Sequence, residues 1–117
     1  MKLQQYTQHF PDIKILPGHI GQCHSERMRC LFHSEKIVAT ESVLGATKIV
    51  ALFIGNEMQL PVPDLELGLP TIVFAKNTLG GGIRIKDVQV GQCITFWVLN
   101  ESDVSVEWSV CITGVCA

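Results

Sequence analysis

Imidazole and thiol side chains, which are common zinc ligands, cluster between residues 19 and 33. His19 with Cys23, and Cys30 with His33, could each supply half of a zinc site. The separation of Cys23 from Cys30 is wider than the tight ligand pairs of structural zinc sites. The spacing makes these four residues weak metal-ligand candidates, and we predict no metal or cofactor. The simpler alternative is a polar surface with buried thiols.

Nucleophilic catalysis requires a serine or cysteine beside an oriented base. All four histidines precede residue 34, and the chain has no Gly-x-Ser-x-Gly segment of the kind that exposes a catalytic serine. No pair of carboxylates is placed in a way that indicates acid–base chemistry across a cleft. We therefore predict no catalytic residues and no enzymatic activity.

The composition is that of one small domain with part of its surface apolar. The chain has 117 residues, of which 47% are hydrophobic and only 17% charged. Ordinary domains carry about 25% charged residues. A small domain has much surface for its volume, so this shortage of charge favours a subunit of an assembly. The alternative is a monomer with an unusually apolar surface.

Charge and apolar runs argue against several partners. The net charge is −2 and the nine basic residues are scattered, so we predict no nucleic-acid partner. The longest apolar run, 49–54, is too short to span a bilayer, and residues 1–8 lack the apolar core of a signal peptide. We therefore expect no membrane partner, synthesis in a reducing host cytoplasm, and five free cysteines.

Short apolar segments separated by turn residues predict an all-β fold. Residues 94–99 and 104–112 alternate with period two around a polar turn at 100–103, which is typical of a β-hairpin. The whole pattern predicts a single β-sandwich or jelly roll of about eight short antiparallel strands. The expected strands lie at 13–16, 28–32, 37–40, 47–54, 71–75, 83–90, 94–99 and 104–112.

Two regions of the chain are predicted to differ in role. Residues 1–18 are polar and interrupted by two prolines, which indicates an N-terminal arm, and residues 19–117 form the sandwich. The strands at 47–54 and 94–99 are apolar on both faces, so one face of each is available to a neighbour. The predicted interface residues, from the arm and these two strands, are Ile13, Ile15, Phe53, Phe96, Trp97 and Leu99.

The order of these features is similar to a known family. A strand at 49–54 ends in Gly55-Asn56, Val90-Gly91-Gln92 leads into the strand 94–100, and a last strand ends in Ile112-Thr113-Gly114. Over about residues 32–115 this pattern resembles the small β-sandwich cement or decoration proteins of tailed bacteriophage capsids.

The resemblance implies a non-enzymatic protein of the virion. Such proteins bind the outer surface of the phage head, commonly as homotrimers, and stabilise it by bridging major capsid subunits. The implied partners are other copies of the chain and the major capsid protein, and the implied location is the capsid surface. An arm could add a strand to an exposed edge of a capsid subunit.

An alternative function is a glycan- or receptor-binding module of a phage tail or baseplate. That function requires an exposed aromatic side chain at a cleft. Trp108 falls on the apolar face of its strand and is predicted to lie in the core, whereas Trp97 lies on the face shared with Thr95 and Leu99. Full burial of both tryptophans would therefore count against this alternative function.

Overall fold

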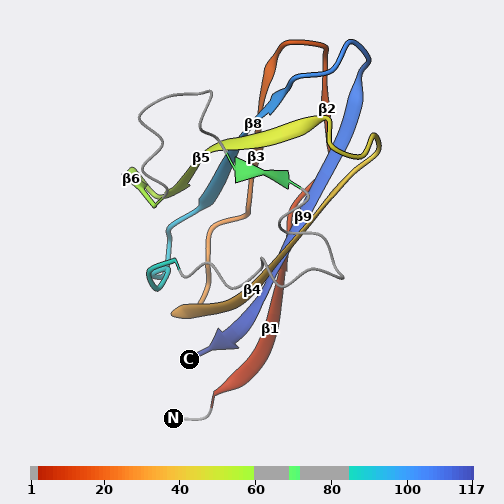
Figure 1. The fold of residues 1–117 in the computed structure, drawn as a ribbon. Helices are drawn as coiled ribbons and strands as arrows, with labels where there is room; N and C mark the ends of the chain where they lie inside the picture. The colour runs from red at the N-terminus through yellow and green to blue at the C-terminus, as the bar shows by residue number, and fades with distance from the viewer. Residues whose placement is uncertain (1–2, 60–68, 72–84) are drawn as a thin grey trace.

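The computed structural model describes residues 3–59, 69–71 and 85–117 (Figure 1). These residues form nine β-strands and no α-helix. Among them no helix is long and apolar enough to cross a membrane. The strands are β1 (Gln4–His9), β2 (Ile13–Ile15), β3 (Ile20–His24), β4 (Phe32–Glu41), β5 (Thr47–Ile54), β6 (Glu57–Met58), β7 (Leu69–Pro70), β8 (Ile94–Asn100) and β9 (Val106–Cys116).

The strands form two antiparallel sheets that pack face to face (Figure 1). In sheet A the long strand β9 is central, with β4 along one edge and β1 and β2 in succession along the other. In sheet B the strand β8 lies between β3 and β5, and β5 also pairs with β6 and β7. The prediction of an all-β antiparallel sandwich is therefore confirmed.

The hairpin predicted for the last third of the chain is wrong. Strands β8 and β9 are consecutive, but β8 pairs with β3 and β5 whereas β9 pairs with β1, β2 and β4. Residues 101–105 carry the chain from one sheet to the other. Asn100 is fully buried at this crossing, where its Nδ2 donates to the carbonyl oxygens of Ile15 (3.0 Å) and Val104 (2.7 Å). These bonds satisfy two backbone carbonyl groups at the crossing.

The arm predicted for residues 1–18 is also wrong. Strand β1 pairs with β9 in continuous register from Gln4 opposite Cys116 to His9 opposite Cys111. Strand β2 continues along the same edge, and Phe10, between the two strands, is buried in the core. The edge strand β1 has exposed side chains on both faces and only one buried side chain, Gln8, which accounts for the polar composition that resembles an arm. Residues 4–15 therefore belong to the sandwich.

The core lies between the two sheets and is built around three aromatic rings. Phe96 packs against Phe10, with ring centroids 5.5 Å apart, and against Trp108, at 5.6 Å. All three side chains are buried. Trp108 also donates its indole N–H to Thr71 Oγ1 at 3.1 Å, and Thr71 Oγ1 lies 2.6 Å from Thr47 Oγ1. The predicted burial of Trp108 is confirmed, and its polar atom is satisfied as burial requires.

Other strand predictions differ in their limits. Of the segment 28–32 only Phe32 lies in a strand, because β4 begins there. Strand β3, at residues 20–24, is not predicted by the sequence, since that segment shows no clear alternation. Residues 72–75 and 83–84 of the predicted strands 71–75 and 83–90 lie outside the described residues, and residues 85–90 do not form a regular strand. Within the described part of 83–90, Val88 forms an isolated bridge with Phe32.

The prediction of five free cysteines is wrong for two of them. Cys30 and Cys116 form a disulfide with their Cα atoms 5.7 Å apart. That separation lies within the range a disulfide can span. Cys116 ends β9 and Cys30 lies just before β4, and β4 pairs with β9 from Phe32 opposite Cys116 onward. The register between these two strands therefore brings the two sulfur atoms together.

Candidate functional site

The four weak metal-ligand candidates are not brought together. Cys30 is bonded to Cys116, and the Cys23 thiol donates to the Pro11 carbonyl oxygen at 3.3 Å. His33 is exposed and lies 2.7 Å from the Asp87 carboxylate, while His19 is exposed on the turn before β3. Within residues 3–59, 69–71 and 85–117, no group of three or more histidine, cysteine or acidic side chains could hold a metal ion.

Cys23 is a core residue with an unreactive thiol. Its side chain is fully buried on the inner face of β3. Desolvation by this burial, with a smaller contribution from the charge of Asp12, raises the pKa of the Cys23 thiol to about 11. A thiol that stays protonated at neutral pH is neither a good nucleophile nor a ready metal ligand.

Two of the predicted interface residues are wrong. Ile15 and Phe96 are 1% and 0% exposed, respectively, and belong to the central core, so neither can contact a neighbour. Ile13 is partly buried and packs against the same core. The two-residue period of a strand explains this outcome, because Ile15 and Phe96 lie on the inner faces of their sheets.

The other three predicted interface residues, Phe53, Trp97 and Leu99, lie on the opposite face of sheet B. We call this the outer face of sheet B. In the β3–β8–β5 register Trp97 lies between Gln22 and Ala51. Phe53, Trp97 and Leu99 are only half-buried, although they sit in the middle of a sheet. Ile20 and Met58 extend this apolar surface to both edges and are 42% and 46% exposed, respectively.

An open hollow of about 270 Å³ lies on this face around Phe53 and Trp97. The two ring centroids are 5.5 Å apart with the planes tilted by 50°. Polar groups complete the lining, and His24 Nδ1 lies 3.0 Å from Thr95 Oγ1. The polar lining residues are Gln22, His24, Asn56 and Thr95.

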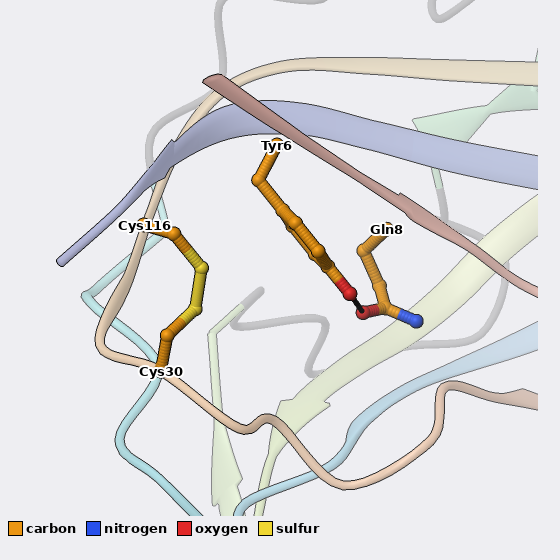
Figure 2. The surroundings of a disulfide bond; sticks show 4 residues. All are labelled: Tyr6, Gln8, Cys30 and Cys116. Atoms are coloured by element: carbon orange, nitrogen blue, oxygen red, sulfur yellow. Dashed lines mark hydrogen bonds between the residues drawn. A yellow bond between two sulfur atoms is a disulfide. The ribbon is translucent and has the colours of Figure 1, made fainter. Parts of the chain in front are cut away.

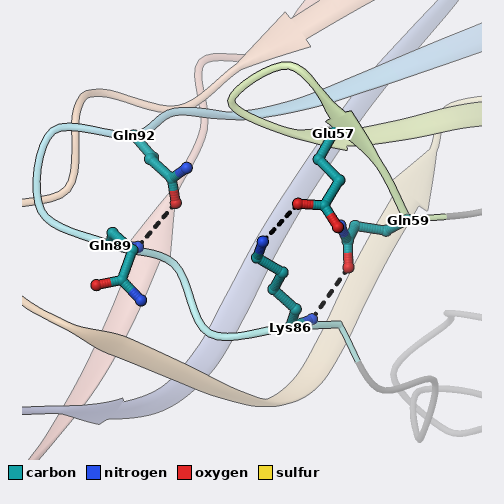
Figure 3. Close-up of polar contacts among 5 residues, drawn as sticks. All are labelled: Glu57, Gln59, Lys86, Gln89 and Gln92. Carbon is teal, nitrogen blue, oxygen red and sulfur yellow. Dashed lines mark hydrogen bonds and ion pairs between the residues drawn. The ribbon is translucent and has the colours of Figure 1, made fainter.

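The edge of this hollow formed by Gly55 and Asn56 is held in place by polar contacts. Gly55 has a φ of +58° and donates its amide to the Cys93 carbonyl oxygen at 2.9 Å. Figure 3 shows the contacts beyond it, where the Lys86 ammonium binds the Glu57 carboxylate and the Lys86 amide donates to Gln59 Oε1. These contacts attach residues 85–92 to the strand β6 that follows the turn.

A second hollow, of about 510 Å³, lies beside the disulfide. We call it the disulfide cleft. Its polar lining comes from β1, including Gln4 and Gln8, and from the segment before Cys30, including Arg27 and Arg29. Figure 2 shows Tyr6 and Gln8 on β1 beside the disulfide, with the Tyr6 hydroxyl donating to Gln8 Oε1 at 3.0 Å.

Sequence reasoning found the aromatic side chains of the first hollow but not its polar partners. Gln22 and His24 belong to a segment with no clear alternation, and only the pairing of β3 with β8 brings them beside Trp97 and Thr95. The sequence does not indicate the disulfide cleft, because the polar composition of β1 predicts an arm. Among the described residues, neither hollow brings a nucleophile, an oriented base and a charge-stabilising group together.

Comparison with known proteins adds no relative. The scan against family models, the search of curated proteins and the search of solved structures each found no significant match to this chain.

Proposed function

We propose that this chain is a non-enzymatic structural protein that binds the outer surface of a bacteriophage head and stabilises it by bridging major capsid subunits. The observation that carries the proposal is the outer face of sheet B. Phe53, Trp97 and Leu99 stay half-exposed in the middle of a sheet, where a monomer would normally place polar side chains. Contact with a neighbouring chain would bury these side chains.

The disulfide supports a location on the exterior of a particle. Disulfides persist in oxidising surroundings, which include virion surfaces, and are rare in the cytosol. The chain carries one disulfide between Cys30 and Cys116, next to the exposed edge of sheet A. A decoration protein made in a reducing cytoplasm would form this bond after the particle leaves the cell.

The mode of binding proposed here uses a sheet face and not an arm. Residues 4–9 and 13–15 are already paired with β9, so they are not available to reach across a capsid subunit. The outer face of sheet B is the remaining predicted contact surface. We propose that it mediates contact between copies of the chain in a homotrimer.

The test measures both the oligomeric state and attachment to heads. Light scattering on the purified oxidised protein should give a trimer, and the protein should co-sediment with heads of the virus that encodes it. Trp97→Ser should weaken the trimer at least tenfold, because it removes an apolar ring from the contact. Leu44→Ser is the matched control, since Leu44 is 75% exposed in the turn before β5, away from the outer face of sheet B.

Two results would count against the proposal. A monomer at every concentration, together with no co-sedimentation with heads, would remove it. If the trimers of Trp97→Ser and wild type are equally stable, the outer face of sheet B does not form the trimer contact. Attachment to heads is then tested separately by co-sedimentation.

A second candidate function, a glycan-binding module, is favoured by one specific observation. The half-exposed Trp97 and Phe53 lie in a hollow that also presents Gln22 and Asn56. Aromatic faces that stack on sugar rings, with amides that bind hydroxyl groups, are a suitable combination for saccharides. A glycan array separates the two functions. The glycan-binding module should bind at least one glycan, and Trp97→Ala should abolish that binding. A decoration protein does not require any glycan binding.

A further inference from the structure

Two guanidinium groups of the disulfide cleft have no anionic partner among the described residues. Neither Arg27 nor Arg29 forms an ion pair within 4.0 Å in that part of the chain. Both side chains are exposed and both line the cleft. Arg27 and Arg29 are the two basic side chains of the described lining, and Glu26 is its one acidic side chain.

The backbone holds the two arginines on one side of their segment. Met28, between them, is 2% exposed and packs into the core, so its neighbours on either side face outward. The Met28 amide donates to the Gln92 carbonyl oxygen at 2.9 Å, and the Ser25 amide donates to the Ile94 carbonyl oxygen at 2.8 Å. The disulfide at Cys30 fixes the other end of the segment. Because this backbone is already held in place, binding a ligand would cost little conformational entropy of the segment.

The opposite wall of the cleft is rich in amides. Gln4, Gln5 and Gln8 line it. The exposed Gln4 and Gln5 amides can both donate and accept hydrogen bonds, whereas the buried Gln8 amide already donates to the His9 carbonyl oxygen at 3.0 Å. The Tyr6 hydroxyl already donates its proton to Gln8, so it is left as an acceptor. Tyr6 is kept in place by an edge-to-face contact with Phe32, with the centroids 5.7 Å apart. Such a wall suits a ligand with several hydroxyl groups.

From these features we infer that the disulfide cleft binds a carboxylated saccharide, such as a hexuronic acid unit. The guanidinium groups match a carboxylate, with which arginine forms charge-assisted and often bidentate hydrogen bonds. The amide wall matches the ring hydroxyls, and a volume of about 510 Å³ lies in the usual range of small-ligand sites. This inference is independent of the proposed function, since it uses sheet A and not the outer face of sheet B.

The test is a titration of the full-length oxidised protein followed by ¹H–¹⁵N NMR. Glucuronic acid should shift the amides of residues 4–8 and 27–30 with a millimolar Kd, and glucose should not. Arg27→Gln and Arg29→Gln should each weaken binding about tenfold to a hundredfold, because a charge-assisted hydrogen bond is lost. Lys14→Gln is the charge-matched control, since Lys14 is exposed on β2 outside the cleft, and it should bind like wild type.

Several results would overturn the inference. The first is no shift at about 50 mM glucuronic acid, where even very weak sites fill. The second is equal binding of glucuronic acid by the arginine variants and wild type. If acetate binds with the same affinity as glucuronic acid, the site recognises a carboxylate but not the sugar ring. If inorganic phosphate binds more tightly than glucuronic acid, the cleft is a phosphate site. If glucose binds with the same affinity as glucuronic acid, the carboxylate does not contribute to recognition.

Discussion

Cys30 and Cys116 are 86 residues apart in the sequence and are joined by a disulfide that closes the chain from just before β4 to the end of β9 into one loop, with β1, β2 and β3 outside it. Cys116 is the last residue of β9, the strand on which β1, β2 and β4 all pair. The bond therefore attaches the segment that precedes β4 to the end of the central strand of sheet A. This link has a measurable consequence for stability.

Replacing both disulfide cysteines by serine should lower the free energy of unfolding by about 3–4 kcal/mol. A long closed loop restricts the unfolded chain strongly, so its loss favours unfolding. Urea unfolding of Cys30→Ser/Cys116→Ser against wild type gives the difference, and Cys111→Ser, at a free half-buried cysteine, is the control. Equal midpoints for the double variant and wild type, or five titratable thiols in the denatured oxidised protein, would contradict the disulfide.

The buried thiol of Cys23 should make stability depend on alkaline pH. Its pKa is about 11 in the folded protein against 9.0 for an unperturbed thiol. The unfolded chain therefore loses this proton first as the pH rises, and stability present below pH 9 falls through the interval up to pH 11. Between about pH 8 and pH 10.5 the wild type should lose about 1–2 kcal/mol more than Cys23→Ala. A constant difference between the two proteins over this interval would show that Cys23 ionises equally in both states.

Asn100→Ala should destabilise the crossing between the sheets by about 2–3 kcal/mol. The substitution leaves the buried carbonyl oxygen of Ile15 without its donor, and it removes the Oδ1 acceptor of the Ser102 amide, which lies 2.9 Å away. Chemical denaturation provides the measurement, and Asn56→Ala, at an exposed turn, should change stability by less than about 0.5 kcal/mol. A loss in Asn100→Ala no larger than in Asn56→Ala would mean that the buried amide does not hold the crossing.

Gly114→Ala should cost about 2–3 kcal/mol through a steric clash in sheet A. A Cβ at residue 114 would lie 2.0 Å from the His33 carbonyl oxygen, at the point where the β4–β9 register shifts. Gly91→Ala separates this clash from backbone strain, because Gly91 has a φ of +89° but open space around it, and it should cost about 1 kcal/mol. Thermal unfolding of both variants measures the two losses of stability. A smaller loss of stability in Gly114→Ala than in Gly91→Ala would argue against this register of β4 on β9.

Local pattern alone determined the fold class, the burial of Trp108 and the presence of a surplus apolar face on β8, but it did not determine which face of β8 is the outer one, so the prediction of Phe96 at an interface is wrong. Phe96 and Trp108 are buried and Trp97 is half-exposed because strand residues alternate between faces whatever the strand pairs with. Half-buried Phe53 and Leu99 follow from the same period. The polar composition of residues 4–9, by contrast, pointed to an arm because an edge strand with exposed side chains on both faces has few apolar residues.

Only the tertiary structure decided which strands pair, and therefore which side chains meet. The period-two pattern of residues 94–112 is the same for a hairpin as for two strands in different sheets; the partners β3, β5, β1 and β4, distant in sequence, select the second. The same long-range pairing joins Cys30 to Cys116, and it places Gln4 to Gln8 opposite Arg27 and Arg29. Such contacts depend on register between segments far apart in the chain, and no local pattern encodes that register.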